Sequence, residues 1–292
     1  MPLSPSPAVV RAADVLRHLA SDPTQRFTVS QLARRIGVPR ATCDTLLLGL
    51  AAGGFVRRDP ARRYELGPAC IVVGDAARAA NPALTAAAQH AEVLAREQQG
   101  VAAVSIRVSE ETRIAGVFDY APALALRVRV GEAIRLVPPF GAVYIAWDDE
   151  DGVDQWLRRA DPPLTQAELS YYRSALQVIR RDGFSATHVP PRQASALEHL
   201  TDDNRQTVRR ARDKAAGRLA HSEYLVAQLE RADTVRIAQI SAPVFEPDGA
   251  IGAAIMMLGP AHDLTAADVR TLGDRVANAA IAATRDIRGI TP

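Results

Sequence analysis

The side chains most often used for catalysis or metal binding are few and far apart in this sequence. Six histidines stand at positions 18, 90, 188, 199, 221 and 262, and the two cysteines are Cys43 and Cys70. None of them has the spacing of a zinc site, a serine-histidine-aspartate arrangement or a glycine-rich phosphate loop. We therefore expect no enzyme, no metal and no cofactor, and we expect the two cysteines to be buried or half-buried free thiols.

One acidic run leaves two interpretations open. Asp148, Asp149, Glu150 and Asp151 stand together, and such a cluster of carboxylates could hold a metal ion. Acidic residues are also favoured at the start of a helix, where the helix dipole is positive. The second interpretation is the stronger one, because a helical pattern begins at Asp149.

Charge is distributed unevenly along the 292 residues. Residues 1 to 80 contain eleven arginines and six acidic residues, a balance of +5, so that the remainder of a chain of net charge +2 carries −3. A basic head on a mildly acidic body predicts a polyanion partner for the head alone. With 48% hydrophobic residues and no apolar run of the ~20 residues that a membrane span requires, we expect two globular domains in the cytoplasm.

The basic head has the pattern of a helix-turn-helix. Apolar residues recur at helical spacing from Val9 to Ala20, and a capping box formed by Thr28 and Gln31 predicts a second helix from Val29. Gly37 and Pro39 predict a tight turn, followed by a third helix over residues 40 to 52. Two helices joined so closely must cross steeply, which suits insertion of the second into a DNA groove.

Two short strands, "FVRRD" and "RRYELG", follow the third helix and complete a winged helix-turn-helix. On this fold the start of the third helix would face bases, and arginines of the second helix and the wing would hold phosphates. The alternative is a small protein-binding module whose arginines only face solvent. The DNA-binding candidates are Arg34, Arg40, Ala41, Thr42, Thr45, Arg57, Arg58, Arg62 and Arg63.

Strand patterns dominate from residue 100 onward, after two helices predicted at 71–80 and 84–99 that would link the domains. Strands are expected in "VAAVSIRVS", "TRIAGVFDY" and "ALALRVRVG", and a hairpin is expected around the turn "EPDG". A capping box formed by Thr165 and Glu168 predicts one further helix, Thr265 and Asp268 predict the start of a last one, and residues 194 to 229 read as polar and helical. We thus divide the chain into residues 1–70, 71–99 and 100–292.

The stretch "RAADVLRHLASDPTQRFTVSQLARRIGVPRATCDTLLLGLAAGGFVRRDPARRYELG" resembles the DNA-binding domain of the IclR family of bacterial transcription regulators. Two later segments, "ISAPVFEPDGAIGAAIMMLGP" and "LTAADVRTLGDRVANAAIAAT", resemble the family's effector-domain hairpin and closing helix. The resemblance implies an α+β fold: an N-terminal winged helix-turn-helix and a C-terminal GAF-like α/β effector domain with a curved antiparallel sheet. It also implies dimers or tetramers.

The resemblance further implies an effector pocket on the segment "IRLVPPFGAVYIAW". Backbone amides at the start of a helix there would suit a carboxylate or another anion. Phe118 and Phe184 have core packing as their alternative role, and Arg129 has exposure on the outer face of its strand. The effector-binding candidates are Phe118, Arg129, Pro139, Phe140, Gly141, Ala142, Val143, Phe184 and Ser241.

Three positions depart from the family pattern. Thr45 replaces an arginine of the recognition helix, Val143-Tyr144 replaces a glycine-lysine pair, and "GFSATHVPP" lacks the family's acidic residue. We expect a regulator that binds a pseudo-palindromic operator as a homodimer or tetramer, under the control of a hydrophobic or aromatic effector, with an acid as one option. The alternative is a small-molecule sensor that acts through protein contacts, with a winged helix that no longer binds DNA.

Overall fold

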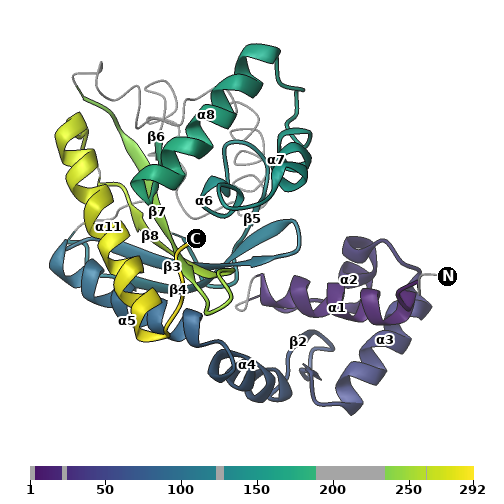
Figure 1. Ribbon diagram of the computed structural model, residues 1–292. Coiled ribbons are helices and arrows are strands. Elements are labelled where there is room, and N and C mark those ends of the chain that lie inside the picture. The colour runs from purple at the N-terminus through teal and green to yellow at the C-terminus, as the bar shows by residue number, and fades with distance from the viewer. Residues whose placement is uncertain (1–3, 22–24, 123–127, 189–233, 261) are drawn as a thin grey trace. The chain divides into compact units, whose positions relative to one another are not determined.

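The protein folds into two compact units, Met1–Asn81 and Pro82–Pro292 (Figure 1). A computed structural model describes residues 4–21, 25–122, 128–188, 234–260 and 262–292. The polar segment from Ala194 to Leu229 lies outside these described residues. Each unit has its own hydrophobic core, so each is described by itself.

The first unit is a winged helix-turn-helix, as predicted. Its core is formed mainly by apolar side chains of the three helices and the hairpin, Leu32, Cys43 and Leu47 among them, which are fully buried. The elements are α1 (Pro7–Ala20), α2 (Val29–Ile36), α3 (Arg40–Ala52), β1 (Val56–Arg58), β2 (Tyr64–Leu66) and α4 (Ala69–Ala79).

Local signals in the sequence set the geometry of the turn between α2 and α3. The capping box is formed: the Gln31 backbone N–H donates to the Thr28 hydroxyl, and the Thr28 backbone N–H donates to the Gln31 side chain. Gly37 closes α2 with a φ of 68°, a left-handed conformation that favours glycine. Pro39 caps α3, which then begins at Arg40. The predicted bounds of both helices are confirmed.

The second unit is built on one antiparallel six-stranded sheet with the order β5-β4-β3-β8-β7-β6. Irregularities in register at Val104/Ser105, Thr187/His188 and Val244/Phe245 add to its curvature (Figure 1). The strands are β3 (Val101–Val108), β4 (Glu111–Asp119), β5 (Ala133–Arg135), β6 (Ser185–His188), β7 (Ile237–Phe245) and β8 (Ile251–Leu258).

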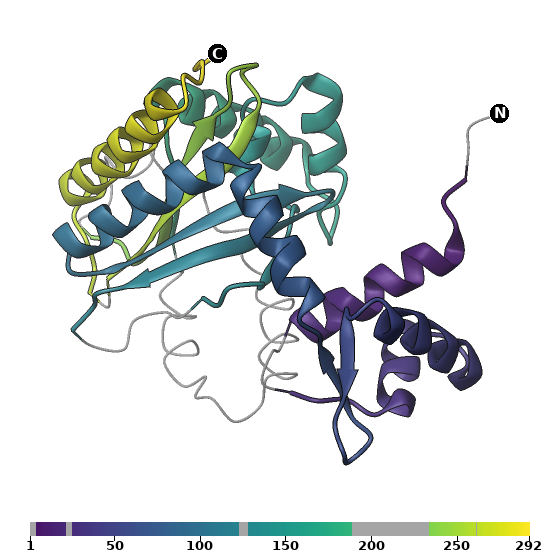
Figure 2. The ribbon, with the colours of Figure 1, turned by 90° about the horizontal axis from the view of Figure 1, so that it is seen from below.

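Helices cover both faces of this sheet. The helices α5 (Pro82–Glu97) and α11 (Ala266–Asp286) lie side by side on one face, which we call the helical face, and share its largest apolar core (Figure 2). The short helix α6 (Ala142–Ile145) packs over β7 and β8 on the opposite, concave face. Two helices, α7 (Glu150–Leu157) and α8 (Gln166–Asp182), pack with α6 around Trp156 and Leu176.

One predicted strand differs from the structure. The period-2 pattern of "ALALRVRVG" predicted a strand up to Gly131, but the described part of it, from Val128, is a turn. The Arg129 carbonyl accepts from the Glu132 backbone N–H at 3.0 Å, which closes that turn. Residues 123–127 of this pattern lie outside the described residues, and the edge strand beside β4 in the described sheet is β5.

Candidate DNA interface and ligand cavity

The start of α3 presents an exposed edge. Arg40, Ala41 and Thr45 are exposed and Thr42 is half-buried, whereas Cys43 and Leu47 point into the core. The Thr45 hydroxyl donates to the Ala41 carbonyl at 3.1 Å, so its lone pairs remain available as acceptors. The structure thus brings the four DNA-binding candidates of this helix together on one edge.

Arg40 has one acidic neighbour on the same helix. The Arg40 Nε lies 3.8 Å from an Asp44 carboxylate oxygen, and the two side chains are 72% and 46% exposed. An exposed pair at this distance is worth ~0.5 kcal/mol or less. DNA phosphates or bases can therefore displace Asp44 from Arg40 at little cost.

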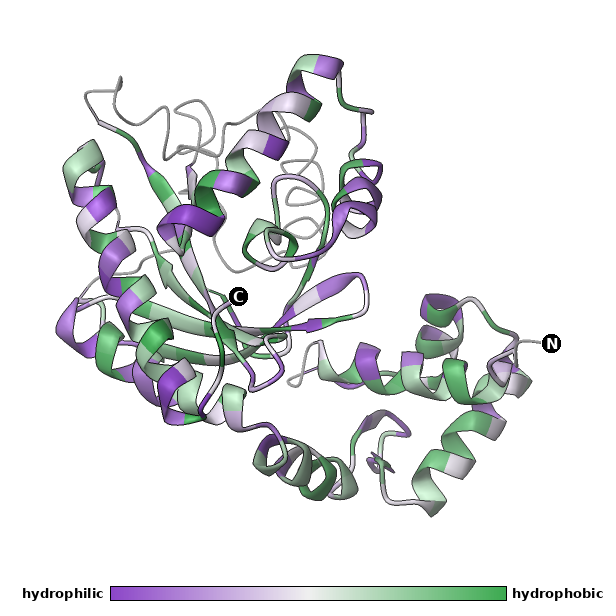
Figure 3. Cartoon of the chain, viewed as in Figure 1, coloured by the Kyte–Doolittle hydropathy of each residue, from purple (hydrophilic) through white to green (hydrophobic). Residues whose placement is uncertain are grey.

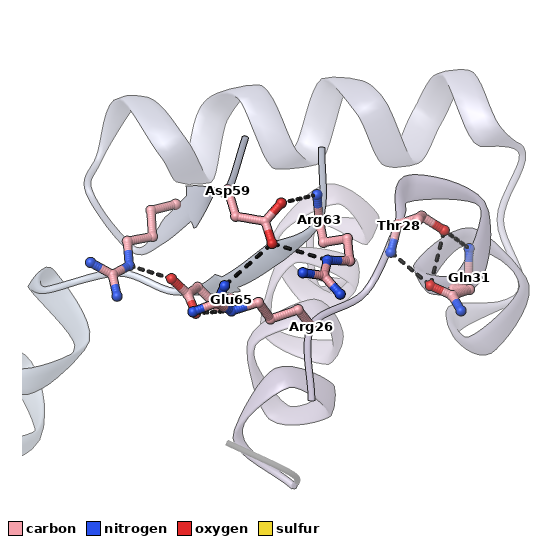
Figure 4. A network of polar contacts seen from close by, with 7 residues as sticks. Arg26, Thr28, Gln31, Asp59, Arg63 and Glu65 are labelled. Atoms are coloured by element: carbon pink, nitrogen blue, oxygen red, sulfur yellow. Dashed lines mark hydrogen bonds and ion pairs between the residues drawn. The ribbon is translucent and has the colours of Figure 1, made fainter. Parts of the chain in front are cut away.

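The wing is held by a network of two acidic and three basic side chains (Figure 4). Asp59 accepts from the Arg63 backbone N–H at 2.8 Å and from the Arg63 Nε at 3.0 Å. Glu65 accepts from Arg26 at 2.7 Å and from Arg57 at 2.5 Å. The backbone N–H of Arg63, followed by the guanidinium groups of Arg63 and Arg26, holds the pKa of Asp59 below its usual range.

This network divides the predicted phosphate-binding arginines into two groups. Arg57 and Arg63 are engaged by Glu65 and Asp59. Arg34 and Arg62 are exposed and form no ion pair within the described residues, and Arg58 lies over the ring of Tyr64, 5.6 Å from its centroid. Arg62 stands at the tip of the wing with a φ of 62°. The second group is free to contact DNA phosphates.

Sequence reasoning missed Arg26 as a part of the wing. Its guanidinium contacts Asp59 and Glu65, which lie 33 and 39 residues further along the chain. No local spacing joins positions so distant. Arg26 enters the site because Phe27 pairs with Tyr64 beside the hairpin, with backbone hydrogen bonds of 3.1 and 2.7 Å in both directions.

The concave face of the second unit carries a cavity. Its empty space measures about 360 Å³, of which much is open to solvent, and the enclosed part has room for about one water molecule. Residues of all six strands and of the segment around α6 line it: Ser105, Thr112, Ile134, Phe140, Gly141, Ala142, Val143, Tyr144, Ser185, Thr187, Gln239, Ser241 and Met256.

Five of the predicted effector-binding residues line this cavity, and four do not. The five that line it are Phe140, Gly141, Ala142, Val143 and Ser241. Pro139 is buried beside it. Pro139 has no N–H, and the Phe140 N–H donates to the Val137 carbonyl at 2.7 Å. These two residues therefore offer no free amide to an anion, contrary to the expectation from the sequence.

Phe118, Phe184 and Arg129 are not among the residues that line the cavity. Phe184 is 1% exposed and packs in the helical-face core, where a Cβ on Gly273 would lie 2.2 Å from its ring. Phe118 packs against the same core, and Arg129 lies exposed in the turn before β5. For the two phenylalanines, the alternative of core packing is the one that the structure supports.

The segment that enters α6 is held rigidly beside the cavity. Gly141 has a φ of 81°, and a Cβ there would lie 2.0 Å from the Leu136 side chain, so only glycine fits. The Trp156 indole N–H donates to the Phe140 carbonyl at 2.9 Å. The Tyr144 hydroxyl, on the next turn, lies 3.0 Å from the Ser105 hydroxyl of β3. These contacts fix α6 over the middle of the sheet.

Other candidate centres have structural roles. Asp149 caps α7 by accepting from the Gly152 N–H at 2.9 Å, and Asp148 binds Arg107, which confirms the acidic run as a helix start. Cys43 is buried and Cys70 half-buried, as predicted, and burial raises the pKa of both thiols. In the part of the chain that the structure describes, no three histidine, cysteine or acidic side chains gather as a metal site. Nor does any described helix combine the length and apolar character needed to cross a membrane.

Comparison with known proteins agrees with this geometry. Residues 8–60 match the family model of the IclR helix-turn-helix domain. Among solved structures, an IclR transcriptional regulator from Alicyclobacillus acidocaldarius is 21% identical, with 97% of this chain and 99% of that chain covered and a TM-score of 0.69. HmgR from Pseudomonas aeruginosa is 19% identical, with 97% and 99% covered and a TM-score of 0.62.

A third solved structure has a ligand. It is an IclR homologue from Microbacterium hydrocarbonoxydans complexed with 4-hydroxybenzoate, 15% identical, with 96% of this chain and 99% of that chain covered and a TM-score of 0.61. At these identities the likeness establishes the fold alone. The search among curated proteins found no match to this chain.

The winged helix-turn-helix and the curved sheet of the second unit define a fold that this chain shares with solved transcription regulators. Residues 8–60 are an IclR helix-turn-helix domain, and the chain has the two-domain fold of the IclR-family regulators.

Proposed function

We propose that the protein binds an operator through α3 and the wing, and that a small molecule in the concave-face cavity changes its occupancy of DNA. The observation that carries the DNA half is the exposed edge formed by Arg40, Ala41 and Thr45 at the start of a helix-turn-helix recognition helix. Two arginines support the same role, Arg34 and Arg62. Both are exposed, and no acidic side chain in the described residues neutralises their charges.

The side chains divide the work of recognition. Arg40 can donate two hydrogen bonds to a guanine, and the Thr42 and Thr45 side chains can contact neighbouring base edges. Arg34, Arg58 and Arg62 would hold phosphates, which supplies affinity without sequence information. Arg57 and Arg63 would mainly keep the wing in shape, since Glu65 and Asp59 engage them.

The surface of α4 supports action as a homodimer, with a tetramer as a further possible assembly. This helix has no buried residue, and Ile71, Val72 and Val73 are 66%, 70% and 54% exposed. Figure 3 shows hydrophobic colour along α4. An exposed apolar helix is a common interface between protein chains. A second copy would present two recognition helices to half-sites of a pseudo-palindromic operator, one DNA turn of ~34 Å apart or a multiple of it.

Support for the ligand half comes from the cavity and from a relative of the same fold. Five predicted effector-binding residues line one cavity on the concave face. The Microbacterium hydrocarbonoxydans homologue is complexed with 4-hydroxybenzoate. A ligand changes DNA occupancy only if it binds two arrangements of the protein with different affinity. Control of DNA binding by a ligand therefore requires this difference in affinity.

Mobility shift with footprinting tests the DNA half. The probe is the DNA upstream of the protein's own gene, and the salt concentration is varied over a series. We expect a protected pseudo-palindrome and an affinity that falls steeply with salt. The double variant Arg40→Ala, Arg62→Ala should lose affinity and show a shallower salt dependence. An unchanged affinity in this variant, or no specific footprint at low salt with or without metabolites of the neighbouring genes, would favour the protein-contact sensor instead.

A further inference from the structure

A group of hydroxyl side chains lines the concave-face cavity. Five serine and threonine residues on four strands point into it, and each is only 1% to 5% exposed: Ser105, Thr112, Ser185, Thr187 and Ser241. Ser185 and Ser241 are directly paired in the β6-β7 register, and Thr187 pairs with Gln239, which also lines the cavity. Paired residues of neighbouring strands share a face of the sheet, so the register itself gathers these groups.

Two of the five hydroxyls have no hydrogen-bond partner among the described residues. Ser105 bonds to Tyr144 at 3.0 Å, and Thr112 donates to the Ile134 carbonyl at 3.4 Å. In contrast, the side-chain oxygens of Thr187 and Ser241 form no hydrogen bond within the described residues. Both side chains line the cavity, so their hydroxyls can bond to whatever occupies it. Two unpartnered hydroxyls beside one cavity therefore point to a ligand, or to water that a ligand replaces.

The described lining of the cavity is uncharged. No lysine, arginine, histidine, aspartate or glutamate occurs among the described residues that form it. The nearby Arg107 donates to both carboxylate oxygens of Asp148, at 2.9 and 2.8 Å. Arg180 donates to the carbonyls of Ala146 and Asp148. Burial raises the pKa of Tyr144, so its hydroxyl stays neutral. A carboxylate bound here would lose its hydration without gaining a cation from the described lining.

We propose that this cavity binds a small uncharged molecule with at least two hydrogen-bonding groups, such as hydroxyls or primary amides, and discriminates against carboxylates. This inference rests on the proposed function, because it names the ligand class of the same cavity. It also changes the expectation from the sequence, which favoured a hydrophobic or aromatic compound. Serine and threonine hydroxyls both donate and accept, so they match neutral groups of either kind.

Matched acid and amide pairs test the charge preference on the full-length protein. Lactate is compared with lactamide, and 4-hydroxybenzoate with 4-hydroxybenzamide, by isothermal titration calorimetry and by the shift of the thermal midpoint. In at least one pair the amide should bind with a Kd at least tenfold below that of the acid. Tighter binding of the acids, or binding of neither amide, would overturn the proposal.

Two variants test the hydroxyls. Ser241→Ala and Thr187→Val each remove one unpartnered hydroxyl with little change in shape, and each should weaken binding of the better amide at least fivefold. Ser174→Ala, on the exposed surface of α8, is the matched control and should bind like the wild type. Because neither removed hydroxyl has a hydrogen-bond partner in the part of the chain that the structure describes, the urea midpoint should not fall. Wild-type affinity in both cavity variants would also overturn the proposal.

The same probes separate this inference from the proposed function when added to the DNA mobility shift. If an amide binds the protein but leaves DNA affinity unchanged, the ligand class stands and the control of DNA binding fails. If only the acids bind and alter DNA affinity, the control of DNA binding stands and the ligand class is wrong.

Discussion

The hydroxyl groups of Tyr144 and Ser105 lie 3.0 Å apart and join α6 to β3 across 39 residues of sequence. Both side chains are only 2% exposed. Their hydrogen bond is one polar contact between the wall of the cavity and the middle strands of the sheet. Because burial keeps the tyrosine protonated, the contact remains neutral and adds no charge to the cavity.

Removing either hydroxyl should destabilise the second unit. Tyr144→Phe and Ser105→Ala each leave the other hydroxyl buried without its partner, so each should cost about 1 kcal/mol in the free energy of unfolding. The double variant should cost less than the sum of the two. Urea unfolding of all four proteins measures this coupling energy, which we expect to be about 1 kcal/mol. A coupling of zero would mean that the two groups do not interact in solution.

The same tyrosine should make stability sensitive to alkaline pH. Its pKa is raised in the folded state, so above about pH 10 the unfolded chain loses a proton that the folded chain keeps. The contribution of Tyr144 is thus fully present below pH 10 and is lost progressively above it. We expect the urea midpoint to fall less between pH 8 and pH 10.5 in Tyr144→Phe than in the wild type. Equal falls would contradict burial of a protonated phenol.

Gly141 should be the least replaceable residue at the entrance of α6. An alanine there needs a left-handed conformation and would bring its Cβ within 2.0 Å of the Leu136 side chain. Gly141→Ala should therefore destabilise the second unit by about 1–3 kcal/mol. The control Gly49→Ala lies inside α3 with no atom within 4 Å of the added Cβ, and it should stabilise the first unit by up to about 1 kcal/mol. Calorimetry that resolves the two units measures both, and a harmless Gly141→Ala would disprove the tight fit.

Two neighbouring arginines of the wing should behave differently toward DNA. Arg62→Ala removes a charge that no acidic side chain pairs within the described residues, so the slope of log K against log salt should become shallower by about 1. Arg63→Ala removes the ion pair between Arg63 and Asp59 and should mainly loosen the wing. The two variants have the same change in net charge. Identical effects on the salt slope would show that the ion pair with Asp59 does not persist on DNA.

The contribution of Asp59 to the stability of the first unit should decrease as the pH falls into the acid range. Its pKa is held down, chiefly by the hydrogen bond from the Arg63 backbone N–H, so its contribution is present above the unfolded value of about 3.9 and is lost as the pH falls through the folded one. Asp59→Asn should lower the thermal midpoint of the first unit at pH 6, and this difference should shrink toward pH 3. A constant difference would assign the loss to packing rather than to charge.

Sequence patterns predicted the first unit well because its geometry depends on local signals. A capping box at Thr28, a left-handed Gly37 and Pro39 each act within a few residues, and each is formed as expected. The ion pairs of the wing were not predictable in this way. Arg26 and Glu65 meet only after the hairpin has folded against the chain before α2.

The cavity was predicted only in part, because alternation in a strand defines two faces without saying which one binds a ligand. The resemblance offered Phe118 and Phe184 as cavity candidates with core packing as the alternative, and both pack on the helical face. Ser105, Thr187 and the other hydroxyls have no strong preference for core or surface, so they gave no signal. An irregularity between Val104 and Ser105 also changes the register, and only the folded sheet reveals it.

The alternation along these strands also bears on how such a protein can change in evolution. Ser241 faces the cavity, while its neighbours Ile240 and Ala242 belong to the helical-face core. Ser105 likewise faces the cavity, while its neighbours Val104 and Ile106 pack in that core. A mutation on one face therefore leaves the packing against α5 and α11 untouched. The lining of the cavity can drift by single steps on one side of the sheet while the other side continues to maintain the fold.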